Sequence, residues 1–226
     1  MRHGETEWSV SGQHTGRADI SLTANGKTEA VRLREQIQGV SFQHVFVSPL
    51  RRALQTCQSA GFGEKAEIEP EITEWDNGDY EGQTHSEIDS VRPGWNLFRD
   101  GCPSGESPMQ ISNRVDRVIA KLRKLNGDIA LFTHGHFGRV FGARWIGLPV
   151  EIAERFLLNT ASLSILSYQH NDEDAPAILQ WNSTSQESIA TLKRPRWGVA
   201  SVACDAAKRK AIERWENEGG ELVVPR

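Results

Sequence analysis

Hydrophobic and polar positions alternate between helical and strand-like spacing through the first 60 residues. Thr23 can cap a helix that ends at Gly39. The inward face of that helix would consist of Ala30, Val31, Leu33 and Ile37. Residues 44–48 predict a short buried strand stopped by Pro49, and residues 50–60 return to helical spacing. Such alternation is typical of parallel α/β proteins.

The middle of the chain carries the clearest helix signal. Ser107 is an N-cap, and Gln110 completes a capping box with it. The apolar side of this helix would consist of Ile111, Val115, Val118, Ile119, Leu122 and Leu125. Residues 128–133 then predict a strand that ends just before His134, and a further helix extends to about residue 146.

The remaining segments complete the predicted fold. Two strand patterns within residues 162–181 flank a polar turn and predict an antiparallel hairpin late in the sheet. Residues 70–106 are rich in glycine, proline, tryptophan and acids and predict a long irregular loop with a functional role. We therefore predict a three-layer α/β/α sandwich with a mostly parallel sheet over residues 1–182. A polar extension would follow at residues 183–226, with one helix at 203–217.

Composition narrows the classes of protein that remain. The chain of 226 residues is 38% hydrophobic and 25% charged, which is ordinary for a folded domain. Its net charge of −4 argues against nucleic acid or anionic membranes as partners. The three cysteines, Cys57, Cys102 and Cys204, are far apart, and we find no run of about 18 apolar residues and no export signal. These features predict a cytoplasmic protein.

Three chemically active residues share one predicted placement. His3 lies near the start, Arg51 follows the strand at 44–48, and His134 follows the strand at 128–133. Ligands of open α/β sheets bind beyond the carboxyl ends of the strands, so Arg51 and His134 should converge there. Each also precedes a helix whose free N–H groups favour an anion. Together with Arg2, these residues predict a phosphate pocket.

The residue types fit phosphoryl transfer. Arginine forks hold phosphate oxygens, and a neutral imidazole can act as a nucleophile. The leaving oxygen needs a proton, for which a carboxylic acid with a pKa raised by burial is suited. Glu74 is our candidate, although a loop could turn inward one of its acidic neighbours, Asp76, Asp79 or Glu81. His134 and His136 alone are too few donors for a typical metal site, so we expect no metal or cofactor.

These residues lie in motifs that resemble those of the histidine phosphatase (phosphoglycerate mutase-like) superfamily. Residues 2–8, RHGETEW, resemble its signature, and residues 48–56, SPLRRALQT, resemble its second arginine motif. Glu74 lies four residues before a glycine, as the family's acid does, and residues 133–135, THG, resemble the second histidine motif. Further stretches, at residues 11–16, 92–102 and 163–168, are similar to the branch that contains sedoheptulose-1,7-bisphosphatase.

The resemblance implies a role for each matching residue. His3 would be the phosphorylated nucleophile, with Arg2, Arg51 and His134 around the phosphate and Glu74 as the proton donor. The predicted substrate contacts are Gly4, Ser9, Thr15, Gly16, Asn77 and Gly135. Ser9 stands where the family usually has asparagine. The sugar-bisphosphatase branch likewise has serine at this position.

The predicted activity is hydrolysis of a small anionic phosphate ester, a sugar phosphate or bisphosphate, by a metal-independent phosphatase that forms phosphohistidine. One alternative is phosphoglycerate mutase, although the mutases' long basic motif for bisphosphoglycerate is not evident. Another is a non-catalytic module that binds a phosphorylated ligand or a protein. The sequence names no protein partner for residues 183–226.

The start of the chain departs from the family pattern. The family carries its nucleophile at the carboxyl end of a central apolar strand, whereas only Met1 precedes Arg2 here. Without that strand its neighbours would keep unpaired edges and the core would lose apolar area. We therefore expect that the start has been assigned too late. The chain as written should be unstable or inactive unless another segment fills the position.

Overall fold

The computed structural model describes residues 1–172, 174–184 and 189. Three parallel strands form one sheet in the order β2-β1-β3. Their bounds are His44–Val47 for β1, Glu67–Ile68 for β2 and Ile129–Phe132 for β3. A separate antiparallel pair consists of β4, Leu163–Tyr168, and β5, Pro176–Ser183. The predicted α/β class, with a mostly parallel sheet and a late hairpin, is confirmed.

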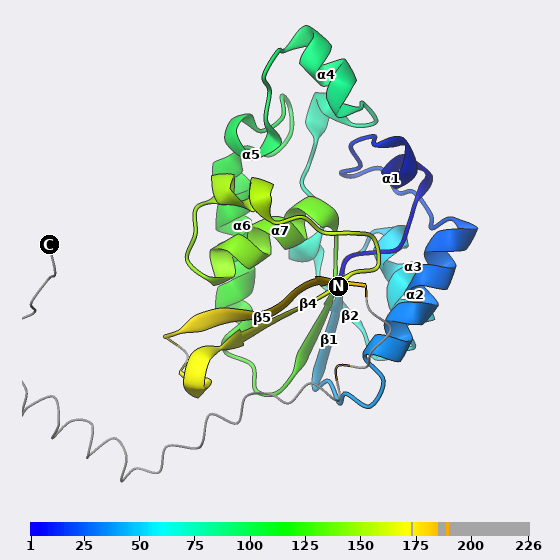
Figure 1. The fold of residues 1–226 in the computed structure, drawn as a ribbon, viewed down its shortest axis with the longest axis vertical. Coiled ribbons are helices and arrows are strands. Elements are labelled where there is room, and N and C mark those ends of the chain that lie inside the picture. Colours follow the sequence, from blue (N-terminus) through cyan, green and yellow to red (C-terminus); the bar gives the residue numbers. More distant parts are fainter. Residues whose placement is uncertain (173, 185–188, 190–226) are drawn as a thin grey trace, which may run out of the picture.

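Helices cover both faces of the parallel sheet (Figure 1). One side holds α2, Ala24–Gln36, and α3, Arg51–Ser59, and the other holds α6, Pro108–Leu122, and α7, Gly135–Trp145. Alternation along β1 explains the two cores, because successive strand residues point to opposite faces. Val45 and Val47 pack in the core with α2 and α3, whereas Phe46 packs in the core with α6 and α7.

The first long helix, α2, agrees with its predicted cap but not with all of its predicted inner face. The Thr23 side chain accepts a hydrogen bond from Gly26 N–H, as an N-cap does. Ala30, Leu33 and Ile37 are buried, whereas Val31 is 50% exposed. Each residue turns the helix by about 100°, so Val31 lies outside the stripe that faces the core.

Short helices occupy much of the segment predicted to be irregular. They include α4, His85–Val91, and α5, Leu97–Asp100. Other short elements are α1 (Glu7–Ser11), η1 (Pro70–Ile72), η2 (Gly78–Tyr80), η3 (Val150–Arg155) and η4 (Gln169–Asn171). The prediction of an irregular loop was thus wrong for residues 85–91 and 97–100, where the burial of nearby Trp95 and Phe98 folds the chain onto the core.

Two expectations concern the end of the chain and the membrane. The helix predicted at 203–217 lies outside the described residues, so the boundary at residue 182 stays a prediction. Within the described ranges, no helix has the length and apolarity that crossing a bilayer requires.

The first three residues lie between β3 and the residues that precede β4. Thr133 N–H donates to Met1 O at 2.9 Å, and His3 N–H donates to Thr133 O at 3.0 Å, which continues a parallel ladder. On the other side, Arg2 N–H donates to Ser162 O at 3.1 Å. This short segment therefore joins the two sheets at one end.

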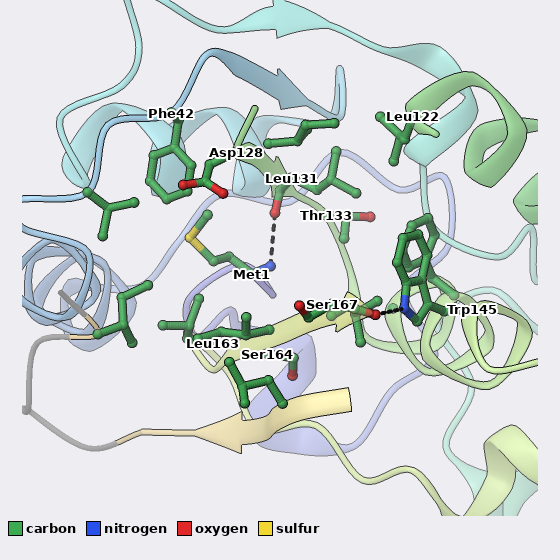
Figure 2. A pocket seen from close by; sticks show the side chains of 18 of the residues that line it. Met1, Phe42, Leu122, Asp128, Leu131, Thr133, Trp145, Leu163, Ser164 and Ser167 are labelled. Atoms are coloured by element: carbon green, nitrogen blue, oxygen red, sulfur yellow. Dashed lines mark hydrogen bonds between the residues drawn. The ribbon is translucent and has the colours of Figure 1, made fainter. Parts of the chain in front are cut away.

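A cavity of about 790 Å³ opens behind Met1, between β3 and β4 (Figure 2). Its walls include Phe42, Leu122, Leu131 and Leu163. In the described part of the chain, no strand lies between β3 and β4. The cavity thus lies beside the short segment of Met1 and Arg2, between the two sheets.

The amino group of Met1 ends in this apolar surrounding. It donates a hydrogen bond to Leu131 O at 2.9 Å. Burial lowers the pKa of the Met1 amino group from 8.0 to about 5. A base with a lowered pKa binds fewer protons in the folded than in the unfolded state, so stability rises with pH between the two pKa values.

We predict that this amino group makes stability depend on pH. Between pH 6.5 and 8.5 the free energy of unfolding should rise by about 2 kcal/mol from this group alone. The Nα-acetylated chain, which has no such charge, should lack this rise. Urea unfolding of both forms at several pH values measures the difference. Equal pH dependence of the two forms would contradict the buried position of Met1.

Candidate functional site

His3 and His134 meet at the carboxyl end of the parallel sheet. His3 follows the short Met1–Arg2 segment, and His134 is the N-cap residue of α7, directly after β3 and Thr133. Their ring centroids are 5.3 Å apart, with the rings tilted by 58°. Both side chains are buried. The predicted convergence of these two imidazoles is therefore observed.

The hydrogen bond of His3 fixes which ring nitrogen is free. Nδ1 lies 2.8 Å from Gly4 O, and a carbonyl can only accept, so Nδ1 carries the proton. Nε2 then holds the lone pair, and the ring lines a cavity. Burial, helped by the charges of Arg2 and Arg52, lowers the pKa of His3 well below 6.5. His3 is thus a neutral imidazole with a nucleophilic nitrogen at physiological pH.

Arg52 is buried beside His134 and ties it to a neighbouring loop. Its Nε donates to His134 Nδ1 at 3.1 Å. Its Nη atoms donate to Ala18 O and Gly16 O, each at 2.8 Å. His134 Nε2 must then carry the ring proton and donates to Ser48 Oγ at 2.7 Å. Burial and the charge of Arg52 lower the pKa of His134 well below 6.5.

The predicted arginine, Arg51, lies away from this cluster. Its side chain is 58% exposed and faces Asp19, with Nε 3.7 Å from the carboxylate. The reason is helical phase, because α3 buries Arg52, Ala53, Thr56 and Cys57 and turns Arg51 outward. Arg51 therefore does not join the cluster in which it was expected, whereas the next residue, Arg52, does.

Arg2 points a free donor at the cavity. Its Nη1 donates to Leu158 O, whereas Nε is buried without a partner among the described residues. A Cβ at Gly135 would lie 3.3 Å from this Nε, so a larger residue there would press on the guanidinium. Gly135 is also the first residue of α7, where a free N–H favours an anion. An unsatisfied buried donor beside a helix N-terminus is suited to an oxyanion.

Glu74 is the acidic residue that reaches the site. Its Oε1 accepts from Phe137 N–H at 2.7 Å and from Trp75 N–H at 3.0 Å, and Oε2 accepts from His136 N–H at 3.0 Å. Two of these donors belong to the first turn of α7. The acidic neighbours have other partners: Asp76 pairs with Arg17, and Glu81 accepts from backbone N–H groups of residues 16–18. The choice of Glu74 agrees with this placement.

Some of the predicted site residues line one cavity of about 200 Å³. The predicted residues that line it are Arg2, His3, Ser9, Thr15, Glu74 and Gly135. Four others, Gly4, Gly16, Asn77 and His134, are buried but do not line it. Gly4 serves a close approach instead, because a Cβ there would lie 2.3 Å from Gly26 O.

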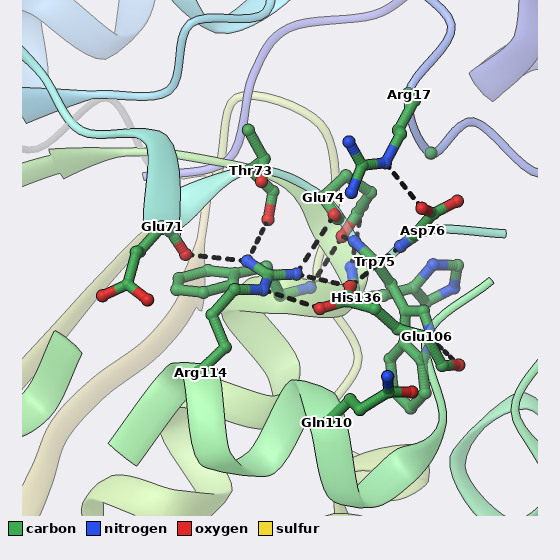
Figure 3. Close-up of polar contacts among 12 residues, drawn as sticks. Arg17, Glu71, Thr73, Glu74, Trp75, Asp76, Glu106, Gln110, Arg114 and His136 are labelled. Atoms are coloured by element: carbon green, nitrogen blue, oxygen red, sulfur yellow. Dashed lines mark hydrogen bonds and ion pairs between the residues drawn. The ribbon is translucent and has the colours of Figure 1, made fainter. Parts of the chain in front are cut away.

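The buried pair of Arg114 and Glu106 braces the loop that carries Glu74 (Figure 3). Arg114 Nε and Nη2 bind the two Glu106 carboxylate oxygens at 2.8 and 2.7 Å. Arg114 also donates to the backbone carbonyls of Glu71, Thr73 and Glu74. The side chains are 11% and 17% exposed, so the bidentate pair is mostly shielded from water.

We predict that Arg114→Ala destabilises the chain by about 3 kcal/mol, because it leaves the mostly shielded Glu106 carboxylate without its counter-charge. Arg117→Ala is the matched control on the same helix, since its pair with Glu71 is 58% and 39% exposed. The control should cost at most about 1 kcal/mol. Urea unfolding measures both. Similar losses would show that the brace contributes no more than a surface ion pair.

Three site residues escaped the sequence analysis: Arg52, Arg139 and Ser48. Arg52 could have been found from the spacing of Ala53 and Cys57, which sets the buried side of α3. Arg139 lies four residues after Gly135 on α7, which places both on the same side of the helix. Nothing in the local pattern distinguishes Ser48, whose burial depends on the strand that it follows.

Known proteins are similar to this chain over most of its length. The family model for the histidine phosphatase superfamily (branch 1) matches residues 1–184. The acid phosphatase of Mycobacterium tuberculosis is 39% identical over 175 residues, which cover 75% of this chain and 85% of that protein. The sedoheptulose 1,7-bisphosphatase of Saccharomyces cerevisiae is 32% identical over 243 aligned positions, with 79% and 89% coverage.

Further similarities extend to mutases and to solved structures. Proteins named phosphoglycerate mutase also match the chain. A solved structure of a Mycobacterium tuberculosis open reading frame product superposes with a TM-score of 0.75 at 34% identity, covering 80% of this chain and 94% of that one. With a family model that spans most of its length and phosphatases among its relatives, this chain belongs to the histidine phosphatase superfamily and is a phosphatase.

Proposed function

We propose that the chain hydrolyses small phosphate esters through a phosphohistidine on His3. The observation that carries this proposal is the neutral His3 ring. Its Nδ1 is engaged by Gly4 O, and His3 lines a cavity together with Arg2, whose Nε is buried without a partner among the described residues. A phosphate group held by Arg2 and by the N–H of Gly135 would lie within reach of a nucleophile that needs no deprotonation.

In the first step, His3 Nε2 attacks phosphorus and the bond from phosphorus to the ester oxygen breaks. The leaving oxygen takes a proton from the Glu74 carboxyl group, and the products are the alcohol and phosphohistidine. In the second step, water attacks phosphorus, Glu74 takes a proton from that water, and the bond between phosphorus and nitrogen breaks. Inorganic phosphate leaves, and His3 returns to its neutral form.

The buried cation Arg52 would act behind the reacting atoms. It touches His134 and the carbonyls of the loop at residues 15–18, and it does not line the cavity. Its charge helps to keep His3 neutral before attack and would stabilise the negative charge that the phosphoryl group brings. We therefore assign Arg52 a positioning and electrostatic role, and Arg2 the direct phosphate contact.

The size of the cavity supports a small substrate. At about 200 Å³ it is smaller than the roughly 300–1,000 Å³ of sites that enclose drug-sized ligands. A phosphorylated sugar or sugar bisphosphate, as the name of the yeast relative suggests, would then have only its phosphorylated end enclosed. The charge of the site favours an anionic ester in the cytoplasm, and the scheme needs no metal ion.

We expect His3→Ala to abolish both activity and covalent labelling. A ³²P-labelled ester should transfer label to the unaltered protein, and that label should resist alkali but not acid, as phosphohistidine does. Phosphate release from 3-phosphoglycerate, followed against formation of 2-phosphoglycerate, separates hydrolysis from mutase transfer. Isomerisation without phosphate release would favour a mutase, and no turnover or labelling of any ester would favour a binding module.

Exchanging the two adjacent arginines tests the corrected assignment. We predict that Arg52→Met lowers kcat/KM by about 100-fold, because His134 and the loop at 15–18 lose their shared anchor. Arg51→Met removes the same charge from an exposed side chain and should leave kcat/KM within about twofold. Phosphate-release assays on folded samples, checked by circular dichroism, give both values. A larger loss in the Arg51 variant would overturn the assignment.

A further inference from the structure

Three polar groups line the reaction cavity without taking part in the proposed chemistry. They belong to His14, His136 and Arg139, which share the cavity with His3 and Arg2. The Nδ1 atoms of His14 and His136 are buried and have no hydrogen-bond partner among the described residues. A buried polar atom without a partner costs about 1–3 kcal/mol, so two such atoms at one cavity point to a missing ligand group.

Aromatic packing holds the two imidazoles in place. The rings of His14 and His136 stack with centroids 5.7 Å apart and planes 21° apart. Trp95 contacts His14 edge-on at 5.3 Å, and Phe98 contacts His136 edge-on at 5.8 Å. The two imidazoles are therefore fixed before any ligand arrives, which lowers the entropy cost of binding.

Both imidazoles are neutral in this environment. Burial, with a contribution from His85, lowers the pKa of His14, and burial with contributions from His14 and Arg139 lowers that of His136 well below 6.5. A neutral imidazole carries one N–H and one lone pair, and it can present its N–H to a ligand oxygen. Each ring is thus available as a hydrogen-bond donor without adding charge.

Arg139 supplies a positive charge on the same side. Its Nε donates to Ala153 O at 3.0 Å, its Nη2 donates to Glu154 O, and its guanidinium lies 4.5 Å above the Phe98 ring. These contacts fix the side chain and leave Nη1 outside the bonds described for it. Glu74, the carboxylate among the described lining residues, is already engaged by three backbone N–H groups. Glu74 and Glu154 act on the charge of Arg139, but among the described residues no carboxylate forms an ion pair with it, so the guanidinium can attract a ligand anion.

We propose that His14, His136 and Arg139 form a subsite for a second anionic group of the substrate, a carboxylate or a second phosphate. The inference rests on the proposed function, because Arg2 and His3 hold the ester phosphate at the other part of the same cavity. Because the cavity measures about 200 Å³, the second anion must lie within a few atoms of the ester. The preferred substrates are short doubly charged esters.

Three matched esters test this subsite. Propyl phosphate lacks a second anion, 3-phosphooxypropanoate carries a carboxylate, and propane-1,3-diyl bisphosphate carries a second phosphate. We expect at least one charged ester to exceed propyl phosphate by about 10-fold in kcat/KM, mainly through a lower KM. The charged ester with the higher kcat/KM shows whether the subsite prefers a carboxylate or a second phosphate. Equal kcat/KM for all three would overturn the subsite while leaving phosphatase activity intact.

Variants assign the preference to the proposed residues. Arg139→Gln and His136→Asn should each remove most of the preference, measured as the ratio of kcat/KM for the charged ester to kcat/KM for propyl phosphate. Arg139→Lys keeps the charge and should retain part of the preference. It therefore shows whether a loss in Arg139→Gln comes from the missing charge or from misfolding. Arg155→Gln is the matched control, because it removes an equal charge from a nearby exposed residue. A preference that persists in both Arg139→Gln and His136→Asn would overturn the assignment.

Binding to His3→Ala separates the two proposals. Calorimetry with the same three esters on this variant measures recognition without turnover. Tighter binding of a charged ester there, together with no turnover in the unaltered chain, would support the subsite and refute the phosphohistidine proposal. Equal binding of all three esters would refute the subsite whatever the activity.

Discussion

The buried charge of Arg52 is the constraint on which the site depends. No carboxylate contacts it within the described residues, and its hydrogen bonds go to His134 Nδ1 and to carbonyls of residues 15–18. The N–H groups of that same loop donate to the Glu81 carboxylate. The peptide groups of the loop thus lie between the charge of Arg52 and the carboxylate of Glu81 that balances it. Because His134 must accept from Arg52, it is neutral, and the same charge helps to keep His3 neutral. Burial, together with the charges of Arg2 and Arg52, therefore leaves both imidazoles uncharged.

Much of this arrangement could be predicted because chain direction in a parallel sheet is reliable. Short apolar runs ending at Ser48 and Thr133 identified the ends of β1 and β3, and both neighbouring helices begin there. His134 was therefore expected at this end of the sheet, whereas Glu74 was chosen from its loop and from the family's spacing before a glycine. The long segment around residues 85–100 was not recognised as helical, since its short helices depend on burying Trp95 and Phe98.

The two adjacent arginines show where such reasoning stops. Motif position alone does not decide between Arg51 and Arg52, because strand order brings the start of α3 to the site but does not set its rotation. Rotation follows from the small buried residues Ala53 and Cys57, which turn Arg52 inward. The subsite residues His14 and His136 depend on contacts between distant loops, and no local spacing reports those contacts.

The position of His3 depends on backbone pairing more than on side-chain packing. Residues 1–3 bond to Thr133 on one side and to Ala161 and Ser162 on the other, and these bonds fix the position of His3 at the end of the sheet. Behind Met1 lies the 790 Å³ cavity, in which no described side chain packs between β3 and β4. Backbone hydrogen bonds contribute only about 1 kcal/mol each, so only a small free energy opposes fraying of the segment that carries His3. Any group that fills the cavity and continues the ladder would therefore stabilise the fold and the position of His3 together.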